Sequence, residues 1–151
     1  MVLTGKITSK LAWTQYQTTN FGINSNVNTE NIVLELDSGS GIGQINQLWY
    51  STLNGNQILD LSDLTQNVFD GQISISFTNG DIKGIIINLL DSATSGTFTL
   101  PFSSSYGNIV VAPSGTTLLG TGSGWKVNPG DTIDLTLTGA GDYNIAILGV
   151  L

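Results

Sequence analysis

Apolar and polar residues alternate along much of this 151-residue chain, so that every second side chain belongs to the same face of an extended strand. The alternation is clearest in segments 73–78 and 133–138, where isoleucine, leucine and phenylalanine are interleaved with serine, threonine and aspartate. Segments 32–36 and 98–102 repeat the pattern. A helix buries residues with a period near 3.6 and would not gather these apolar side chains on one face. The sequence therefore predicts an all-β protein.

Turn signals separate these segments. Asn54-Gly55, Asp70-Gly71 and Asn79-Gly80 tolerate positive φ angles and close tight hairpins, and Asn128-Pro129-Gly130-Asp131 is a proline-initiated turn. Strands at intervals of about 8 to 12 residues, with turns between them, are typical of sandwiches, jelly rolls and barrels. We expect an antiparallel, jelly-roll-like β-sandwich. The apolar run 82–90 is expected to be a strand buried on both faces or the central strand of a sheet.

The beginning of the chain differs in character from the rest. Segment 11–17 is a strand candidate, whereas threonine and asparagine dominate segment 18–29 without a clear period, which predicts a loop. We expect residues 1–30 to hold N-terminal strand structure and an extended loop or arm, and residues 31–151 to form the β-sandwich, within one domain overall. A projecting arm and an ordinary long loop between two strands are both open at this point.

The sequence lacks the side chains that usually carry chemistry near neutral pH. It contains no histidine, no cysteine and no arginine, so acid–base, thiol or phosphoryl-transfer chemistry would depend on Asp, Glu, Lys and Tyr. Asp60 and Asp63, like Asp131 and Asp134, lie three residues apart, a spacing that puts strand side chains on opposite faces. We expect no catalytic residues, and a hydrolase built from distant carboxylates is the least favoured alternative.

Charge and hydropathy narrow the choice of partner. The net charge is -7, and Lys6, Lys10, Lys83 and Lys126 leave no basic stripe for DNA or RNA. For this reason no nucleic-acid partner is expected. No run of 18 apolar residues and no secretion signal is visible, so no membrane partner is expected either. With 10% charged residues, the surface consists largely of neutral hydroxyl and amide groups, which are less costly to desolvate than ions. This favours an assembly subunit, with a secreted β-domain as the alternative.

Two Gly-x-Gly-x-Gly segments, at 39–43 and 120–124, are candidates for phosphate or metal binding. Neither opens a predicted helix, so nucleotide cradling is not supported. Asp37 and the carbonyl groups after it offer oxygen ligands for calcium, but the order of a dedicated calcium loop is missing, and a flexible turn is the default. We expect no metal and no cofactor.

Aromatic residues are the remaining candidates for binding. Trp13, Trp49, Tyr50 and Trp125 are candidate interface anchors or stacking platforms for sugar rings, although aromatic residues at strand ends more often belong to a core or a subunit interface. Trp49 and Tyr50 are adjacent in a predicted strand and therefore point to opposite faces. One of the two is expected to meet a neighbouring subunit, a loop or solvent.

The order of features from Leu34 onward resembles a family of small virion proteins of tailed bacteriophages, the capsid decoration or cement proteins. The N-terminal asparagine-rich stretch and the Asp70-Gly71 step depart from the family pattern. The similar segments are 11–13 (LAW), 36–49 (LDSGSGIGQINQLW), 59–65 (LDLSDLT), 69–77, 82–88 (IKGIIIN), 127–131 (VNPGD) and 143–149 (YNIAILG).

This resemblance implies a non-enzymatic structural protein on the capsid exterior of the virion, which binds the major capsid protein and stabilises the head. It also implies a homotrimer at local threefold axes and no active site. The alternative is a carbohydrate-binding or receptor-binding β-sandwich module, including a tail or baseplate adhesin, in which the tryptophans stack on sugars.

Overall fold

The computed structural model describes residues 3–19, 22–68, 71–90, 95–101, 109–139 and 141–151; within 9–19 and 22–32, and at positions 68 and 109, it describes the backbone alone. These residues form strands and turns and no helix, so the all-β prediction is confirmed. No helix long and apolar enough to cross a membrane occurs in this part of the chain.

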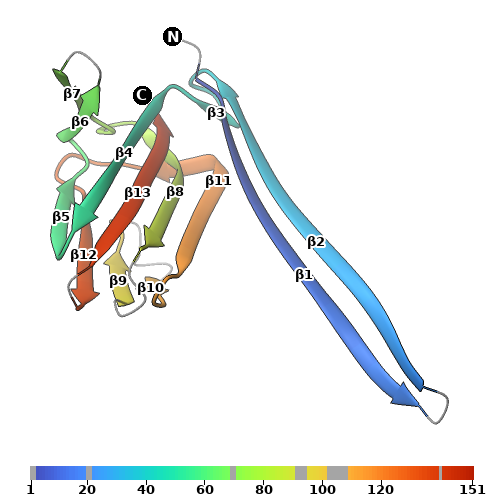
Figure 1. The fold of residues 1–151 in the computed structure, drawn as a ribbon. Helices are drawn as coiled ribbons and strands as arrows, with labels where there is room; N and C mark the ends of the chain where they lie inside the picture. The colour runs from blue at the N-terminus through green and yellow to red at the C-terminus, as the bar shows by residue number, and fades with distance from the viewer. Residues whose placement is uncertain (1–2, 20–21, 69–70, 91–94, 102–108, 140) are drawn as a thin grey trace.

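Two four-stranded sheets pack face to face (Figure 1). Every strand pairing within them is antiparallel, so the predicted antiparallel β-sandwich is confirmed. The first sheet has the order β11 (Thr116–Lys126), β8 (Asp81–Leu89), β13 (Asp142–Val150) and β4 (Gln47–Asn54). The second sheet has the order β10 (Ile109–Val111), β9 (Ser95–Thr99), β12 (Thr132–Thr138) and β5 (Gln57–Asp60).

The main core lies between the two sheets and follows the period-two pattern of the sequence. Ile133, Leu135 and Leu137 of β12 are buried, while the intervening residues are more exposed. Tyr143 and Ile145 of β13 are buried in the same core. The run 82–90 corresponds to β8, which lies between β11 and β13 in the interior of the first sheet.

Two hairpins complete the fold. One is short and consists of β6 (Leu64–Val68) and β7 (Gly71–Ile75). The other joins β1 (Gly5–Thr19) to β2 (Gly22–Ser38) through an unbroken register, and β2 also pairs in parallel with β3 (Gln44–Ile45). In Figure 1 the β1–β2 hairpin leaves the sandwich beside β11 and extends well beyond it.

The segment 18–29, expected to be an exposed loop or arm, is regular strand over most of its length, so an irregular loop is wrong there. Residues 22–29 belong to β2, and each pairs with a residue of β1. Asparagine has a low intrinsic preference for strands, but this preference is weak compared with a complete set of backbone hydrogen bonds. The composition of the segment predicts irregular structure, but its backbone pairing with β1 makes it a strand.

A second, smaller core fixes the start of this hairpin to the outer face of the first sheet. We call the buried or half-buried residues Ile7, Leu34 and Leu36 the hairpin base; they pack with Ile45 and Leu148. The contact needs two glycines that face each other in β8 and β11. A Cβ atom on the first, at position 84, would lie 2.6 Å from Ile7 Cδ1, and one on the second, at position 120, would lie 3.0 Å from Leu34 Cδ2. The glycines thus form a hollow that receives the hairpin base.

Replacing Gly84 by alanine is expected to loosen the hairpin base, because the added methyl group would lie 2.6 Å from Ile7 Cδ1 and the end of the Ile7 side chain must shift. Overpacking of this kind costs about 1–3 kcal/mol of unfolding free energy. Amide hydrogen exchange should become faster at residues 5–8 and 33–37. Gly122→Ala is the matched control, since no atom lies within 4 Å of its added Cβ. Unchanged exchange in Gly84→Ala would contradict this account of the contact.

Tyr143 provides a pH-dependent test of the main core. Its side chain is fully buried, its hydroxyl has no hydrogen-bond partner among the described residues, and burial raises its pKa to about 12 from the usual 10.0. The unfolded chain loses this proton first, so folding stability should fall as the pH rises from 10 towards 12. Tyr143→Phe should remove this part of the decline and raise the unfolding free energy at neutral pH by about 1 kcal/mol, measured by denaturant unfolding. A large destabilisation by Tyr143→Phe would contradict the prediction.

Candidate functional site

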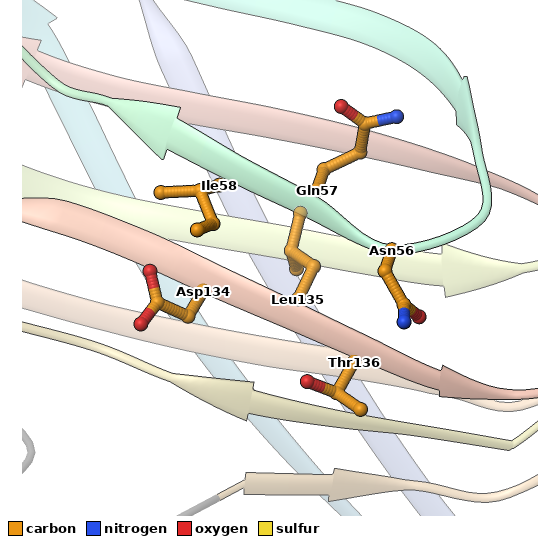
Figure 2. Close-up of a pocket in the computed structure, with 6 residues that line it drawn as sticks. All are labelled: Asn56, Gln57, Ile58, Asp134, Leu135 and Thr136. Atoms are coloured by element: carbon orange, nitrogen blue, oxygen red, sulfur yellow. The ribbon is translucent and has the colours of Figure 1, made fainter.

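A shallow groove runs along the edge of the second sheet, between β5 and β12 (Figure 2). Its volume is about 340 Å³, and it is lined by Asn56, Gln57, Ile58, Asp134, Leu135 and Thr136. The groove forms where β5 begins, because backbone pairing with β12 stops at Gln57 and Leu135. Two residues further along β12, the Leu137 N–H donates instead to Asn56 Oδ1 at 2.8 Å. A side-chain amide therefore replaces a strand at this edge.

The groove combines polar groups with one exposed apolar side chain. Asp134 is the single ionisable residue among the six that line it, and Thr132 Oγ1 donates to Asp134 Oδ1 at 3.1 Å. Ile58 is 73% exposed. A general acid and a general base cannot both come from this lining. The groove is suited to binding a partner through hydrogen bonds while Ile58 becomes buried.

The carboxylates considered as acid–base candidates accept hydrogen bonds from nearby turns. The Ser62 hydroxyl and N–H donate to Asp60 Oδ1 at 2.6 and 2.8 Å, and they hold the pKa of this carboxyl below its usual 3.8. Asp131 Oδ2 accepts from the Asn128 N–H at 2.7 Å. A catalytic carboxyl acid that works near neutral pH needs a raised pKa, so Asp60 is a turn-stabilising group. In the described ranges no three of His, Cys, Asp and Glu are grouped to hold a metal ion.

The outer face of the first sheet carries a smaller hollow of about 150 Å³ next to Tyr50. The strand register places Thr116, Asn88, Asn144 and Thr52 in one row across this face. Thr116 Oγ1 donates to Asn88 Oδ1 and Thr52 Oγ1 donates to Asn144 Oδ1, both at 2.7 Å. These bonds use the amide oxygens of the two asparagines, and the amide N–H groups are the donors that this row can offer to a ligand.

The four aromatic candidates do not form one stacking surface. Trp49 is 3% exposed in the main core and its indole N–H donates to the Thr65 carbonyl at 2.9 Å, whereas its neighbour Tyr50 is 55% exposed. This is the division between opposite faces that their adjacent positions predict. Trp125 is half-buried against the same core. Trp13 lies in β1, and its side chain is outside the described part of the structure. Among the described candidates, Tyr50 is the one available to a ligand or partner.

Lys83 is a structural site that the sequence analysis did not single out. Its side chain is 2% exposed, and its ammonium donates to the carbonyl oxygens of Ser123 at 2.6 Å and Gly122 at 3.3 Å. Asp81 Oδ2 lies 3.8 Å from the same nitrogen. The pairing of β11 with β8 is interrupted over residues 121–124, which frees these carbonyls. The signal for this site in the sequence was a lysine within the apolar run 82–90, together with a glycine-rich segment at 120–124 whose carbonyl groups could accept from it.

The two glycine-rich segments meet in the folded chain. The Gly43 N–H donates to the Gly122 carbonyl at 2.9 Å, and the Gly43 carbonyl accepts from the Asp37 N–H at 2.9 Å. Gly43 has a φ of 69°, a left-handed conformation that favours glycine. The first segment is thus a turn between β2 and β3. The Gly122 carbonyl accepts from both Lys83 and Gly43, so it joins Lys83 to the turn that follows the β1–β2 hairpin.

Lys83→Met is expected to destabilise the protein, because the carbonyls of Gly122 and Ser123 lose a charged donor. The Gly122 carbonyl keeps the Gly43 N–H, so the main loss is the hydrogen bond from the lysine to the Ser123 carbonyl, and a hydrogen bond from a charged donor contributes about 1.5–3 kcal/mol. Lys126→Met, an exposed lysine at the end of β11, is the matched control and should cost less. Thermal or denaturant unfolding measures both. Equal stabilities of the two variants would show that Lys83 does not hold the interrupted segment of β11.

Comparison of the chain with family models, with curated proteins and with solved structures finds no match.

Proposed function

We propose that this protein is a non-enzymatic structural subunit of a virion: a capsid decoration or cement protein that binds the major capsid protein on the capsid exterior and stabilises the head. The β1–β2 hairpin is the observation that carries the proposal, because its strands are 15 and 17 residues long and extend beyond the sandwich (Figure 1). An isolated two-stranded hairpin is marginally stable in water at best. A hairpin of this length is expected to be covered by other chains.

The outer face of the second sheet supports contact with a capsid. Strand pairing aligns Thr136 of β12 with Thr97 of β9, so hydroxyl groups occupy the middle of this face, beside the carboxylate of Asp134. At its two edges Ile58 and Val110 are 73% and 70% exposed. Hydroxyl groups desolvate at lower cost than charged groups, and apolar side chains gain from burial. This face and the groove of Figure 2 are the proposed capsid-binding surface.

The strand order supports a jelly-roll assignment within the same proposal. With the eight sandwich strands numbered along the chain, the first sheet reads 6-3-8-1 and the second 5-4-7-2. Two Greek keys folded into a sandwich produce this order, which viral capsid and lectin domains use. Because one fold serves many functions, the order is compatible with the proposal and does not select it.

Capsid shells that lack this protein are expected to recruit it at about micromolar concentration, measured by co-sedimentation. Ile58→Asp should weaken recruitment by about tenfold or more, because the contact would bury an unpaired charge. Ile42→Asp is the matched control, since Ile42 is 85% exposed in the turn between β2 and β3. Shells that recruit none of the protein would overturn the proposal, and equal effects of the two variants would exclude the second sheet as the contact surface.

A second candidate function is carbohydrate or receptor binding, including the role of a tail adhesin. The hollow beside Tyr50 favours it, because an exposed aromatic ring and the amide donors of Asn88 and Asn144 are groups that can hold a sugar. Tyr50→Ala should then reduce binding on a glycan array at least about tenfold, while Ile42→Ala leaves it unchanged. Absence of binding to any host polysaccharide would remove this alternative.

A further inference from the structure

We propose that the β1–β2 hairpins of neighbouring copies pair edge to edge, β1 of one copy against β2 of the next, and thereby close a cyclic homo-oligomer. The inference builds on the proposed function as an assembly subunit, and it names the surface, the partner and the polarity of the contact. The partner is a second copy of this chain.

The first observation is that the hairpin carries no proline and no bulge along its described backbone. The register between β1 and β2 runs without a bulge from Gly5↔Leu36 to Thr19↔Gly22, and no proline occurs before position 101. In the described residues β2 gains a further partner at Asp37 and Ser38 alone, where it meets β3. Natural sheets protect long edges with prolines, bulges or a covering segment. The remaining edges therefore offer backbone N–H and C=O groups for strand addition.

The second observation is that the two strands carry opposite charges. β1 contains Lys6 and Lys10 and no carboxylate, whereas β2 contains Glu30, Glu35 and Asp37 and no cation. Within one hairpin the attraction is already used, since Lys6 Nζ lies 2.7 Å from Glu35 Oε1. Pairing β1 with β1, or β2 with β2, would bring like charges together, whereas pairing β1 with β2 brings opposite charges together.

Charge therefore decides the symmetry of the contact. A two-fold dimer that joins hairpins edge to edge must use the same edge twice, which the charges disfavour. A β1-to-β2 contact uses different edges, so each copy can bind a neighbour on either side until the ring closes. Hairpins that run along the axis of such a ring place β1 antiparallel to the neighbouring β2, the same sense as within each hairpin. Three copies would give a closed sheet of six strands without edges.

The sequence of β1 is consistent with an enclosed face in this ring. Leu11 and Trp13 occupy positions on the same face of β1 as Ile7, which packs against the sandwich at the hairpin base. On the same face the register places Glu30 opposite Leu11 and Asn28 opposite Trp13, so this face combines apolar and polar positions beyond the sandwich. Leu11 and Trp13 are the apolar positions that the interior of a closed ring would cover.

Charge reversal in the full chain tests the contact. Lys6→Glu with Lys10→Glu makes both strands negative, and Glu30→Lys with Glu35→Lys makes both net positive. Each pair of substitutions should raise the concentration at half assembly by at least about tenfold, measured by analytical ultracentrifugation at low salt. The variant with all four substitutions has the net charge of the natural chain, keeps an ion pair between positions 6 and 35, and should restore assembly. Lys126→Glu, outside the hairpin, should leave assembly unchanged.

Three results would overturn the inference: a natural chain that stays monomeric up to about 100 μM, two-charge variants that assemble like the natural chain, or a fourfold variant that stays dissociated. An equimolar mixture of the two charge-reversed variants gives a second measurement, because each offers the edge that the other lacks, so the two should bind each other more strongly than either binds itself. All of these readouts use the protein alone. Loss of capsid recruitment would therefore count against the proposed function and not against the pairing of hairpins.

Discussion

The apolar contact between the inner faces of the two sheets sets the conditions for everything else in this molecule. Residues such as Ile133, Leu135 and Ile145 use one face of each sheet for the core, so any contact with another molecule has to be made by the outer faces or by strands outside the sandwich. The two outer faces have separate uses. The first sheet holds the hairpin base over its glycine hollow, and the second sheet exposes hydroxyl groups between two apolar edges.

Those parts of the fold that depend on local pattern could be predicted from the sequence. Alternation in segment 133–138 gave a strand with one buried face, and adjacency placed Trp49 and Tyr50 on opposite sides. The turn predicted at Asn54-Gly55 is present, with a φ of 67° at Gly55, but the predicted tight hairpin is wrong there, because the flanking strands β4 and β5 belong to different sheets. In each case the deciding interaction lies within a few residues of the signal, which is why a single sequence reveals it.

Parts that depend on distant partners could not be predicted in this way. The asparagine-rich segment 22–29 is a strand because β1 pairs with it, and the residues of the segment do not by themselves predict this pairing. Lys83 lies within the apolar run 82–90, and its carbonyl partners lie about 40 residues away, at Gly122 and Ser123. The glycines at 84 and 120 are a similar case, because the reason for a missing side chain at each position is the close approach of Ile7 and Leu34, which are distant in the sequence. Long-range complementarity of this kind is invisible to periodicity.

The parallel pairing of β2 with β3 has a mechanical consequence. Asp37 pairs with Gln44 and Ser38 with Ile45, and Asn46 then binds the end of β13 through the Gly149 carbonyl and the Leu151 N–H. A force that pulls the hairpin away along its own axis is therefore transmitted along strand axes into the sandwich. The turn 39–43 joins the same two strands covalently, so a load on β2 reaches β3 through the chain as well as through the paired backbone groups.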